Sequence, residues 1–417
     1  MISFPKRERA QRAAACVGVD AGKFSHTLVI RPQHQPDSKP FSFPTTRAGF
    51  DSAVTFIRQQ VPGAAAATIL VGIEFAGNYG FTFAHYLAQL GFPIVSVLPA
   101  HTKRWKDVAH NQPLKTDAKD AGTITDLLTQ GHFVTFPFLA PAYGDLRYLV
   151  TARERLSLLR RGAITQLRTL IQVVFSEFEA LFPLVTKKTP FTLLRTFPTP
   201  QDLLEAPRTQ VLRVLRSASR GHLGTDTYHQ LVTAAQATLG LPGAQARLRQ
   251  EILLTLERIA LFERQIKALE AELVAALQAV PETPYLLSIP KVAPVTAAIF
   301  LGSIGDPRAY ESGQQILRVA GLSLVARSSG VLRGTKRISK RGRPLLRQAA
   351  YMFAVRSITK GSLFRAEYEA LCQRNGGAKM KAVVAVMRSG LRLLYSIARD
   401  RRMFTIEPPA RRRAAAA

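Results

Sequence analysis

The sequence predicts an α/β domain near the N-terminus, followed by long coiled-coil helices and a mainly helical, basic C-terminal domain. Short apolar runs alternate with amphipathic segments in the first part of the chain, helical repeats dominate the middle, and basic residues dominate the last third. These observations predict an α/β domain over 14–135, helices over 143–283 with a helical insertion at about 186–244, a basic domain over 284–405 and a disordered tail over 406–417.

The charge balance indicates a polyanionic partner. The chain has 57 Lys and Arg against 28 Asp and Glu, a formal net charge of +29, and such an excess favours nucleic acid over a membrane surface. No apolar stretch approaches the roughly 18 residues of a membrane span, and the charged start does not resemble a signal peptide. The two cysteines, Cys16 and Cys372, fit a reducing compartment. We therefore expect a cytoplasmic protein.

The predicted strands and helices of the first domain follow a definite order. Helices are predicted at 48–60, 79–90 and 116–130, and strands at 16–20, 26–30, 41–43, 69–74 and 94–98. A hairpin, a third strand, and then alternating helices and strands is the order of an RNase H-like fold. In that fold the first and fourth strands are neighbours, so we expect Asp20 and Glu74 to lie side by side.

Four acidic residues are placed where this fold could gather them. Asp20 and Glu74 each end an apolar run, and Asp117 and Asp120 are spaced to share one face of a helix. Magnesium binds few carboxylates together with water and phosphate. Two such ions about 3.5–4 Å apart clamp the attacking and leaving oxygens of an in-line displacement. The sequence therefore predicts a site for two Mg²⁺ ions, although each acid taken alone could be a helix cap or a turn residue.

Two long segments, 145–182 and 245–280, carry helical repeats. In the second, apolar residues alternate at spacings of four and three, which is typical of a coiled coil. Two interpretations are open: a stalk through which two copies dimerise, and an antiparallel hairpin of both helices within one chain. The segment between them, 186–244, shows no motif.

The last third contains a basic run without acidic residues, from Glu311 to Glu367. Solvated charged faces usually mix signs, whereas this run does not, and its glycines would let backbone amides approach phosphates. Helices are predicted at 344–359 and 378–398. We interpret eight basic residues of this run, with four at earlier positions, as nucleic-acid contacts. They are Arg327, Arg333, Lys336, Arg337, Lys340, Arg341, Arg343, Arg347, Lys291, Lys103, Arg104 and Lys115.

Several short motifs, taken together, resemble one known family. The acidic motifs Val17-Gly18-Val19-Asp20, Gly72-Ile73-Glu74 and Lys115-Thr116-Asp117 with Lys119-Asp120-Ala121 resemble the DEDD catalytic set of insertion-sequence transposases with a RuvC-like domain. This is the insertion sequence one-ten family. Segments of the second half are similar to that family in the same order, at 289–297, 320–322, 329–330 and 338–347. The resemblance covers nearly the whole chain apart from about 186–244.

The resemblance implies a prokaryotic, nucleoid-associated DNA transposase whose metal ligands are Asp20, Glu74, Asp117 and Asp120. It also implies that Ser329, or its neighbour Ser328, is the nucleophile that joins covalently to DNA. A serine hydroxyl needs activation, which metal ions and nearby arginines could supply electrostatically. The family further implies an element-encoded guide RNA and a homodimer or homotetramer. Without the resemblance, Ser329 would be interpreted as a turn residue.

The chain departs from the family at one turn. Lys291 and Ala293 stand where the family usually has glycines, so a phosphate contact there would depend on the Lys291 ammonium. Two other functions fit the same residues. One is a metal-dependent DNA junction nuclease in which water attacks, and the other is a non-catalytic nucleic-acid-binding scaffold.

Overall fold

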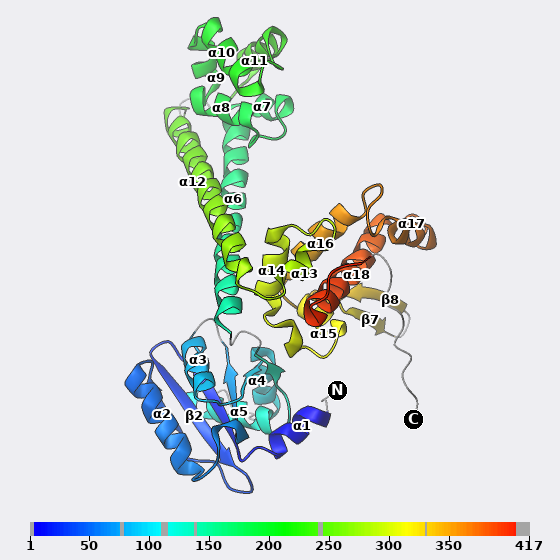
Figure 1. The fold of residues 1–417 in the computed structure, drawn as a ribbon. Coiled ribbons are helices and arrows are strands. Elements are labelled where there is room, and N and C mark those ends of the chain that lie inside the picture. Colours follow the sequence, from blue (N-terminus) through cyan, green and yellow to red (C-terminus); the bar gives the residue numbers. More distant parts are fainter. Residues whose placement is uncertain are drawn as a thin grey trace. The chain divides into compact units, whose positions relative to one another are not determined.

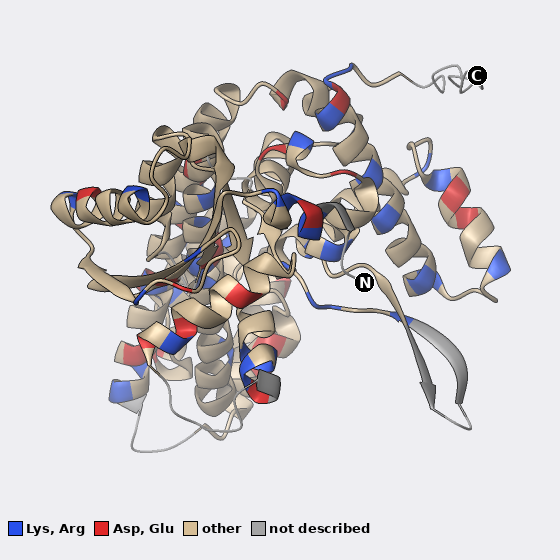
Figure 2. Cartoon of the chain, turned by 90° about the horizontal axis from the view of Figure 1, so that it is seen from below, with Lys and Arg blue, Asp and Glu red and all other residues tan. Residues whose placement is uncertain are grey.

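The computed structural model describes residues 4–75, 79–109, 116–136, 140–240, 245–329 and 332–405. The chain divides into two compact units, which are considered separately (Figure 1). The first unit contains Met1–Gly144, Pro284–Lys291 and Ser303–Ala417, and the second contains Asp145–Thr283 and Val292–Gly302. Figure 2 shows that Lys and Arg are spread over the chain instead of gathered on one element. Among the described residues, no helix is both long and apolar enough to cross a membrane.

A six-stranded sheet forms the N-terminal part of the first unit, in the order β3-β2-β1-β4-β5-β6. The strands are β1 (Ala15–Ala21), β2 (Ser25–Pro32), β3 (Phe41–Pro44), β4 (Ile69–Glu74), β5 (Ile94–Val97) and β6 (Val134–Thr135). β1, β4 and β5 are parallel, while β2, β3 and β6 pair antiparallel to their neighbours. The five predicted strands are confirmed. β6 was not predicted, because a strand of two residues is too short to show a period.

The predicted pairing of the first and fourth strands is also confirmed. In the parallel register of β1 and β4, Gly18 lies opposite Gly72 and Asp20 lies opposite Glu74. Both strands run as nearly continuous apolar stretches and are buried up to their last residues, as expected for strands covered on both faces. The two carboxylates therefore sit at the same edge of the sheet, where burial ends.

Five helices accompany the sheet: α1 (Phe4–Gln11), α2 (Arg47–Gln60), α3 (Phe81–Gln89), α4 (Pro99–Ala109) and α5 (Asp117–Thr129), with a short 3₁₀ turn at Ala66–Thr68. On one face, Ile124 of α5 packs in a common core with Cys16 of β1 and Leu70 of β4. On the other face, His26 packs with Phe50 of α2 and Phe83 of α3. The three predicted helices are confirmed, whereas α1 and α4, both strongly basic, were missed.

The second unit is built on two long antiparallel helices, α6 (Pro141–Val174) and α12 (Gln245–Gln278). Arg153 pairs with Glu270 at 2.5 Å, and Arg160 pairs with Glu263 at 2.5 Å. Partner numbers fall on α12 as they rise on α6, so the chain forms the intramolecular hairpin, one of the two interpretations left open by the sequence (Figure 1). Coiled-coil packing of this hairpin stays a prediction.

The prediction of one unbroken helix over 145–182 is wrong. Phe175 leaves the helical conformation, with φ −154° and ψ 71°, and a separate helix, α7 (Ser176–Leu181), follows it. The aromatic side chain of Phe175 is buried with that of Phe178. The sequence period continues across the break because α7 buries apolar residues in the same helical cluster.

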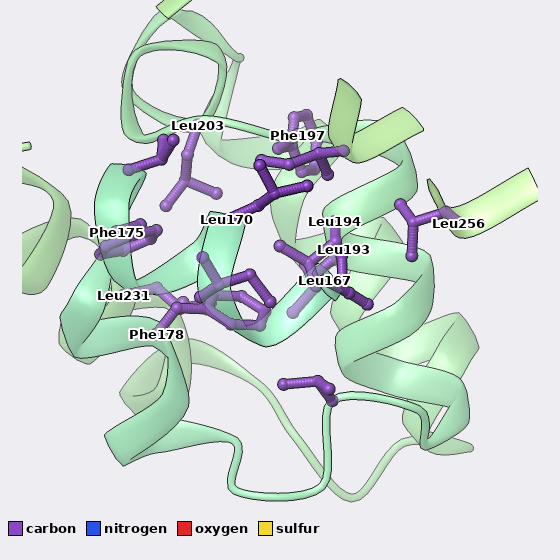
Figure 3. Close-up of a cluster of buried hydrophobic side chains, with 14 of the residues drawn as sticks. Leu167, Leu170, Phe175, Phe178, Leu193, Leu194, Phe197, Leu203, Leu231 and Leu256 are labelled. Carbon is purple, nitrogen blue, oxygen red and sulfur yellow. The ribbon is translucent and has the colours of Figure 1, made fainter. Parts of the chain in front are cut away.

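The predicted helical insertion contains four helices, α8 (Lys188–Thr196), α9 (Pro200–Glu205), α10 (Arg208–Ser219) and α11 (Thr225–Ala237). They close around the adjoining ends of α6 and α12 in one apolar core. Figure 3 shows side chains from all parts of this cluster pointing toward one another, among them Leu170, Phe178, Leu194, Leu231 and Leu256. The cluster is a packed module with its own interior.

The C-terminal region is mainly helical, as predicted. Its elements are α13 (Thr283–Leu287), α14 (Pro294–Ile304), a 3₁₀ turn (Pro307–Ala309), α15 (Gly313–Val319), β7 (Leu324–Ser329), β8 (Leu332–Ile338), α16 (Pro344–Ser357), α17 (Arg365–Arg374) and α18 (Lys379–Asp400). α18 packs closely on α16 at Gly390, where a Cβ would come within 2.9 Å of the Phe353 ring. The antiparallel β7–β8 hairpin was not predicted, because basic and small residues interrupt its apolar alternation.

Candidate active site

The edge of the sheet holds the first two predicted acids. Asp20 is the penultimate residue of β1 and Glu74 is the last residue of β4, and both are half-buried. Their opposite positions in adjacent parallel strands follow from the apolar runs that precede each acid. The prediction that these two residues lie side by side is therefore confirmed.

Helix α5 brings the other two acids to this edge. It lies directly against β1 at Gly18, where an added Cβ would be 2.3 Å from Thr125 Oγ1 and 2.6 Å from the Ala121 carbonyl oxygen. Thr125 Oγ1 donates to the Val29 carbonyl at 3.2 Å, which fixes the helix to β2. Glycine at position 18 is required for this close approach, because any side chain would push the helix away.

The direction of α5 is fixed by an ion pair at its other end. Arg31, which lies opposite Cys16 near the start of β1, bonds Asp126 at 2.8 Å. Helix α5 therefore runs opposite to β1, and its first turn, with Asp117 and Asp120, lies at the end of β1 that carries Asp20. Thr116 caps the helix by accepting a bond from the Lys119 amide at 3.4 Å, and acids in a first turn are favoured by the helix dipole.

The four acids act on one another electrostatically. Burial, and then the negative charges of Asp120, Asp117 and Glu74, raise the pKa of Asp20 to about 6. Lys106 acts in the opposite sense and lowers this pKa. A carboxyl that resists ionisation in this way marks a place where negative charge is concentrated and a cation is favoured.

Lys106 of α4 supplies a positive charge within this cluster. Its Nζ lies 2.5 Å from Oδ1 of Asp120, which is itself buried. Lys106 was not among the predicted site residues. The sequence placed it in a general basic run with Lys103 and Arg104, and the contact depends on the packing of α4 against α5, which no local pattern reveals.

The residue types fit a hard divalent cation, since all four donors are carboxylates. As the side chains are arranged, no group of three or more His, Cys, Asp or Glu residues among those described forms a ready-made metal shell. The ion pair with Lys106 occupies one of the oxygens of Asp120. The ammonium group of Lys106 is thus the positive charge in contact with Asp120 in this structure.

The predicted nucleophile belongs to a different element. Ser329 is the last residue of β7, opposite Leu332 of β8, and Ser328 precedes it in the same strand. Only the backbone is described there. The side chains of Ser328, Ser329, Arg327, Arg333 and Lys336 lie outside the described part of the structure, as do Gly330 and Lys115 entirely. The structure therefore brings the four acids together and does not locate the serine hydroxyl.

The other predicted nucleic-acid contacts fall into two groups. Lys103, Arg104, Lys291, Arg337, Lys340 and Arg341 are exposed. Arg343 and Arg347 instead donate to backbone carbonyls, Arg343 to Ser303 and Arg347 to Ala320 at 2.9 Å. These hydrogen bonds tie both arginines to the C-terminal ends of α14 and α15 and use part of their donor groups. Lys291 has φ 69°, a conformation that suits the glycine usual at this kind of turn.

The fold and site define a strongly basic protein with an α/β domain that gathers four acids at one edge of its sheet. Two family models match the chain: a DEDD transposase model over residues 17–176 and the "Transposase IS116/IS110/IS902 family" over residues 283–369. The first contains the four acids and the second contains the β7–β8 hairpin. The chain belongs to the IS110 family of insertion-sequence transposases.

Individual relatives match over long stretches. An uncharacterized 44.8 kDa protein of insertion element IS116 from Streptomyces clavuligerus is 27% identical, covering 94% of this chain and 96% of the relative. The corresponding 43.6 kDa protein of IS110 from Streptomyces coelicolor is 24% identical over the same shares. A 42 kDa protein of IS900 from Mycobacterium paratuberculosis is 30% identical, covering 70% of this chain and 73% of the relative.

Proposed function

We propose that this transposase cleaves and rejoins DNA strands at a two-metal site formed by Asp20, Glu74, Asp117 and Asp120. The observation that carries the proposal is the convergence of three elements, β1, β4 and α5, at which burial, and then the charges of the other three carboxylates, raise the pKa of Asp20. The sheet order, with β1 parallel to β4 and antiparallel to β2, supports an RNase H-like assignment of this domain.

Within this proposal, Mg²⁺ ions would be held by the four acids and, when bound, would stabilise the charge on the attacking and leaving oxygens. Asp20 and Glu74, fixed in the sheet, orient one side of the site. Asp117 and Asp120, on the first turn of α5, supply the other side. Lys106 would release Asp120 in the metal-bound protein, and its ammonium would then be available to the DNA phosphate.

In the covalent step, the nucleophile is Ser329 of the β7–β8 hairpin. Its Oγ forms a bond to the phosphorus of the scissile phosphodiester and loses its proton, while the bridging oxygen on the other side leaves as a hydroxyl. Attack by a second DNA hydroxyl on the phosphoserine reverses the same bond changes and joins new strands. Arg327 and Arg333, on the two strands of this hairpin, would stabilise the charge that develops on the phosphate.

The proposal includes the predicted partners: DNA, an element-encoded guide RNA, and further copies of the chain. The net charge of +29 supports nucleic-acid binding. Because the apolar stripe of α12 faces α6 of the same chain, the long helices provide no separate support for a dimer. The homodimer or homotetramer and the RNA therefore rest on the family resemblance.

The test is to trap a protein–DNA adduct. Full-length protein is incubated with Mg²⁺, labelled DNA bearing the element's own ends, and RNA transcribed from the element's flanks, and is then separated on a denaturing gel. We expect an adduct that Ser329→Ala abolishes and Ser328→Ala retains. Asp20→Asn should reduce adduct formation by roughly 10²–10³-fold, the usual cost of losing a group that stabilises transition-state charge.

Each other outcome points to a different function. Cleavage without an adduct would indicate a junction nuclease that uses water. DNA binding without cleavage, unchanged in Asp20→Asn, would indicate a scaffold. An adduct that persists in Ser329→Ala would remove Ser329 from the mechanism.

A further inference from the structure

Helix α10, in the cluster of the second unit, has two sharply different faces. Val211, Leu215 and Ala218 are buried in the core of the cluster. The opposite face is fully exposed and carries only arginine and hydroxyl side chains: Thr209, Arg213, Arg216, Ser217 and, at the left-handed C-cap, Arg220. The buried face explains why α10 is a helix, but it does not explain the composition of the exposed face.

The charge of this face is not balanced. No acidic residue occurs between Glu205 and Asp226, and among the described residues Arg213, Arg216 and Arg220 have no carboxylate within ion-pair distance. Some arginines elsewhere in the same unit are paired, for example Arg160 with Glu263 and Arg249 with Asp202. Solvated helix faces usually alternate in sign, so an unpaired arginine row indicates an anionic partner.

The types and spacing of the side chains on this face of α10 indicate which anionic partner they suit. Arginine and hydroxyl side chains are among those that most often contact the phosphate oxygens of nucleic acids. The eight residues from Arg213 to Arg220 span roughly 10 Å of helix, which matches about three nucleotides along one strand. No aromatic side chain lies on this exposed face, whereas single-stranded nucleic acid is held largely by aromatic stacking.

We propose that the arginine row of α10, Arg213, Arg216 and Arg220, binds the phosphate backbone of duplex DNA without sequence preference. This surface would hold the DNA on the helical cluster, in a segment that shows no motif and lies between the two family matches. The proposal rests on membership of a transposase family and not on the acid site, so either can fail without the other.

The experiment compares two triple variants of the full-length protein with equal loss of charge. The first is Arg213→Gln, Arg216→Gln and Arg220→Asn, with asparagine chosen because position 220 has φ 57° and asparagine tolerates this conformation. The control is Arg247→Gln, Arg264→Gln and Lys267→Gln, exposed residues of α12, a helix that also carries several glutamates. Binding to a labelled duplex DNA of arbitrary sequence is measured in chelator, between 50 and about 200 mM salt.

The salt dependence of binding gives the decisive readout. Each lost phosphate contact should lower the slope of log K against log salt by about 0.9, so the α10 variant should lose about 3 in slope. The control should retain the wild-type slope. Equal effects in the two triple variants would overturn the proposal, because net charge alone would then explain them.

Two further measurements cover misfolding of the triple variant and binding to RNA instead of DNA. If the triple variant does not fold, Arg213→Gln alone should lower the slope by about 1, and an unchanged slope would contradict the proposal. A duplex RNA of the same length is the second probe. Loss of RNA binding with DNA binding intact would overturn the assignment to DNA.

Discussion

Two groups of like charges occur in this protein: the acid cluster of β1, β4 and α5, and the arginine row of α10. They differ in burial and in the number of elements that supply them. The acids are brought together from three elements and are partly buried. Burial, and then the charges of the other acids, raise the pKa of Asp20, and Lys106 pairs with Asp120. The arginines follow one another along a single helix and stay in solvent. Burial and convergence prepare a site for a compact cation, whereas an exposed row suits an extended polyanion. Variants that disturb one group should therefore leave the other intact.

The largest expected effect comes from Gly18→Ala, which would separate α5 from β1. The new Cβ would meet backbone atoms of α5, so the helix must shift, and we expect the free energy of unfolding to fall by at least about 2 kcal/mol. Divalent-metal binding should be lost with it, because Asp117 and Asp120 move away from Asp20. Urea unfolding and metal titration provide the measurements.

Gly162→Ala is the matched control for this variant. Gly162 lies inside α6, with open space where its Cβ would be, so alanine should stabilise the helix by about 0.5–1 kcal/mol. If both glycine variants had the same effect, the close approach at Gly18 would not be what positions the acids.

Lys106→Met tests whether this lysine competes with metal for Asp120. Without the ammonium the metal has no ion pair to displace, and we expect Mn²⁺ to bind about three- to tenfold more tightly, an amount in keeping with a partly exposed ion pair. Lys103→Met, an exposed position on the same helix, should not change the affinity. Weaker metal binding in Lys106→Met would mean that Lys106 orients Asp120 for the metal instead of competing with it.

The third prediction concerns the other face of the sheet, where the imidazole of His26 is fully buried among Phe43, Phe50 and Phe83. Burial lowers the pKa of His26, so the unfolded chain takes up a proton near pH 6.5 that the folded protein does not. Stability should therefore decrease as the pH falls below about 6.5, by at most about 1.4 kcal/mol per pH unit from this group. His26→Phe should remove this part of the pH dependence in thermal unfolding. The exposed His222, changed to Gln, should leave it unchanged.

The smallest expected effects compare paired and unpaired arginines. Arg160→Gln breaks the bond with Glu263 between α6 and α12, and such partly exposed pairs contribute about 0.2–1 kcal/mol. Arg213→Gln, on the exposed face of α10, should not change the free energy of unfolding measurably. A clear destabilisation by Arg213→Gln would show that the α10 row has a structural role.

The sequence predicted the structure best where a local pattern and the order of the elements both indicated the same contact. The apolar runs ending at Asp20 and Glu74 predicted two strands, and the order of elements predicted their pairing, so the meeting of these acids could be foreseen. The contact of Lys106 with Asp120 could not, because it arises from the packing of two helices. The break at Phe175 was hidden because the apolar period continues beyond it. The arginine row of α10 was not foreseen, because the segment 186–244 shows no motif and the row becomes a face only once the buried side of the helix is known.

Joint binding of divalent cations by the four acids underlies every step proposed for this site. Calorimetric titration of the metal-free, full-length protein with Mn²⁺ tests it directly, with Asp20→Asn and Asp120→Asn as site variants and Asp226→Asn, an exposed acid of α11, as control. We predict saturable binding of about two ions per chain to the wild type and the control, and loss of at least one ion in each site variant. Equal binding by all four proteins, or none by the wild type, would contradict the account.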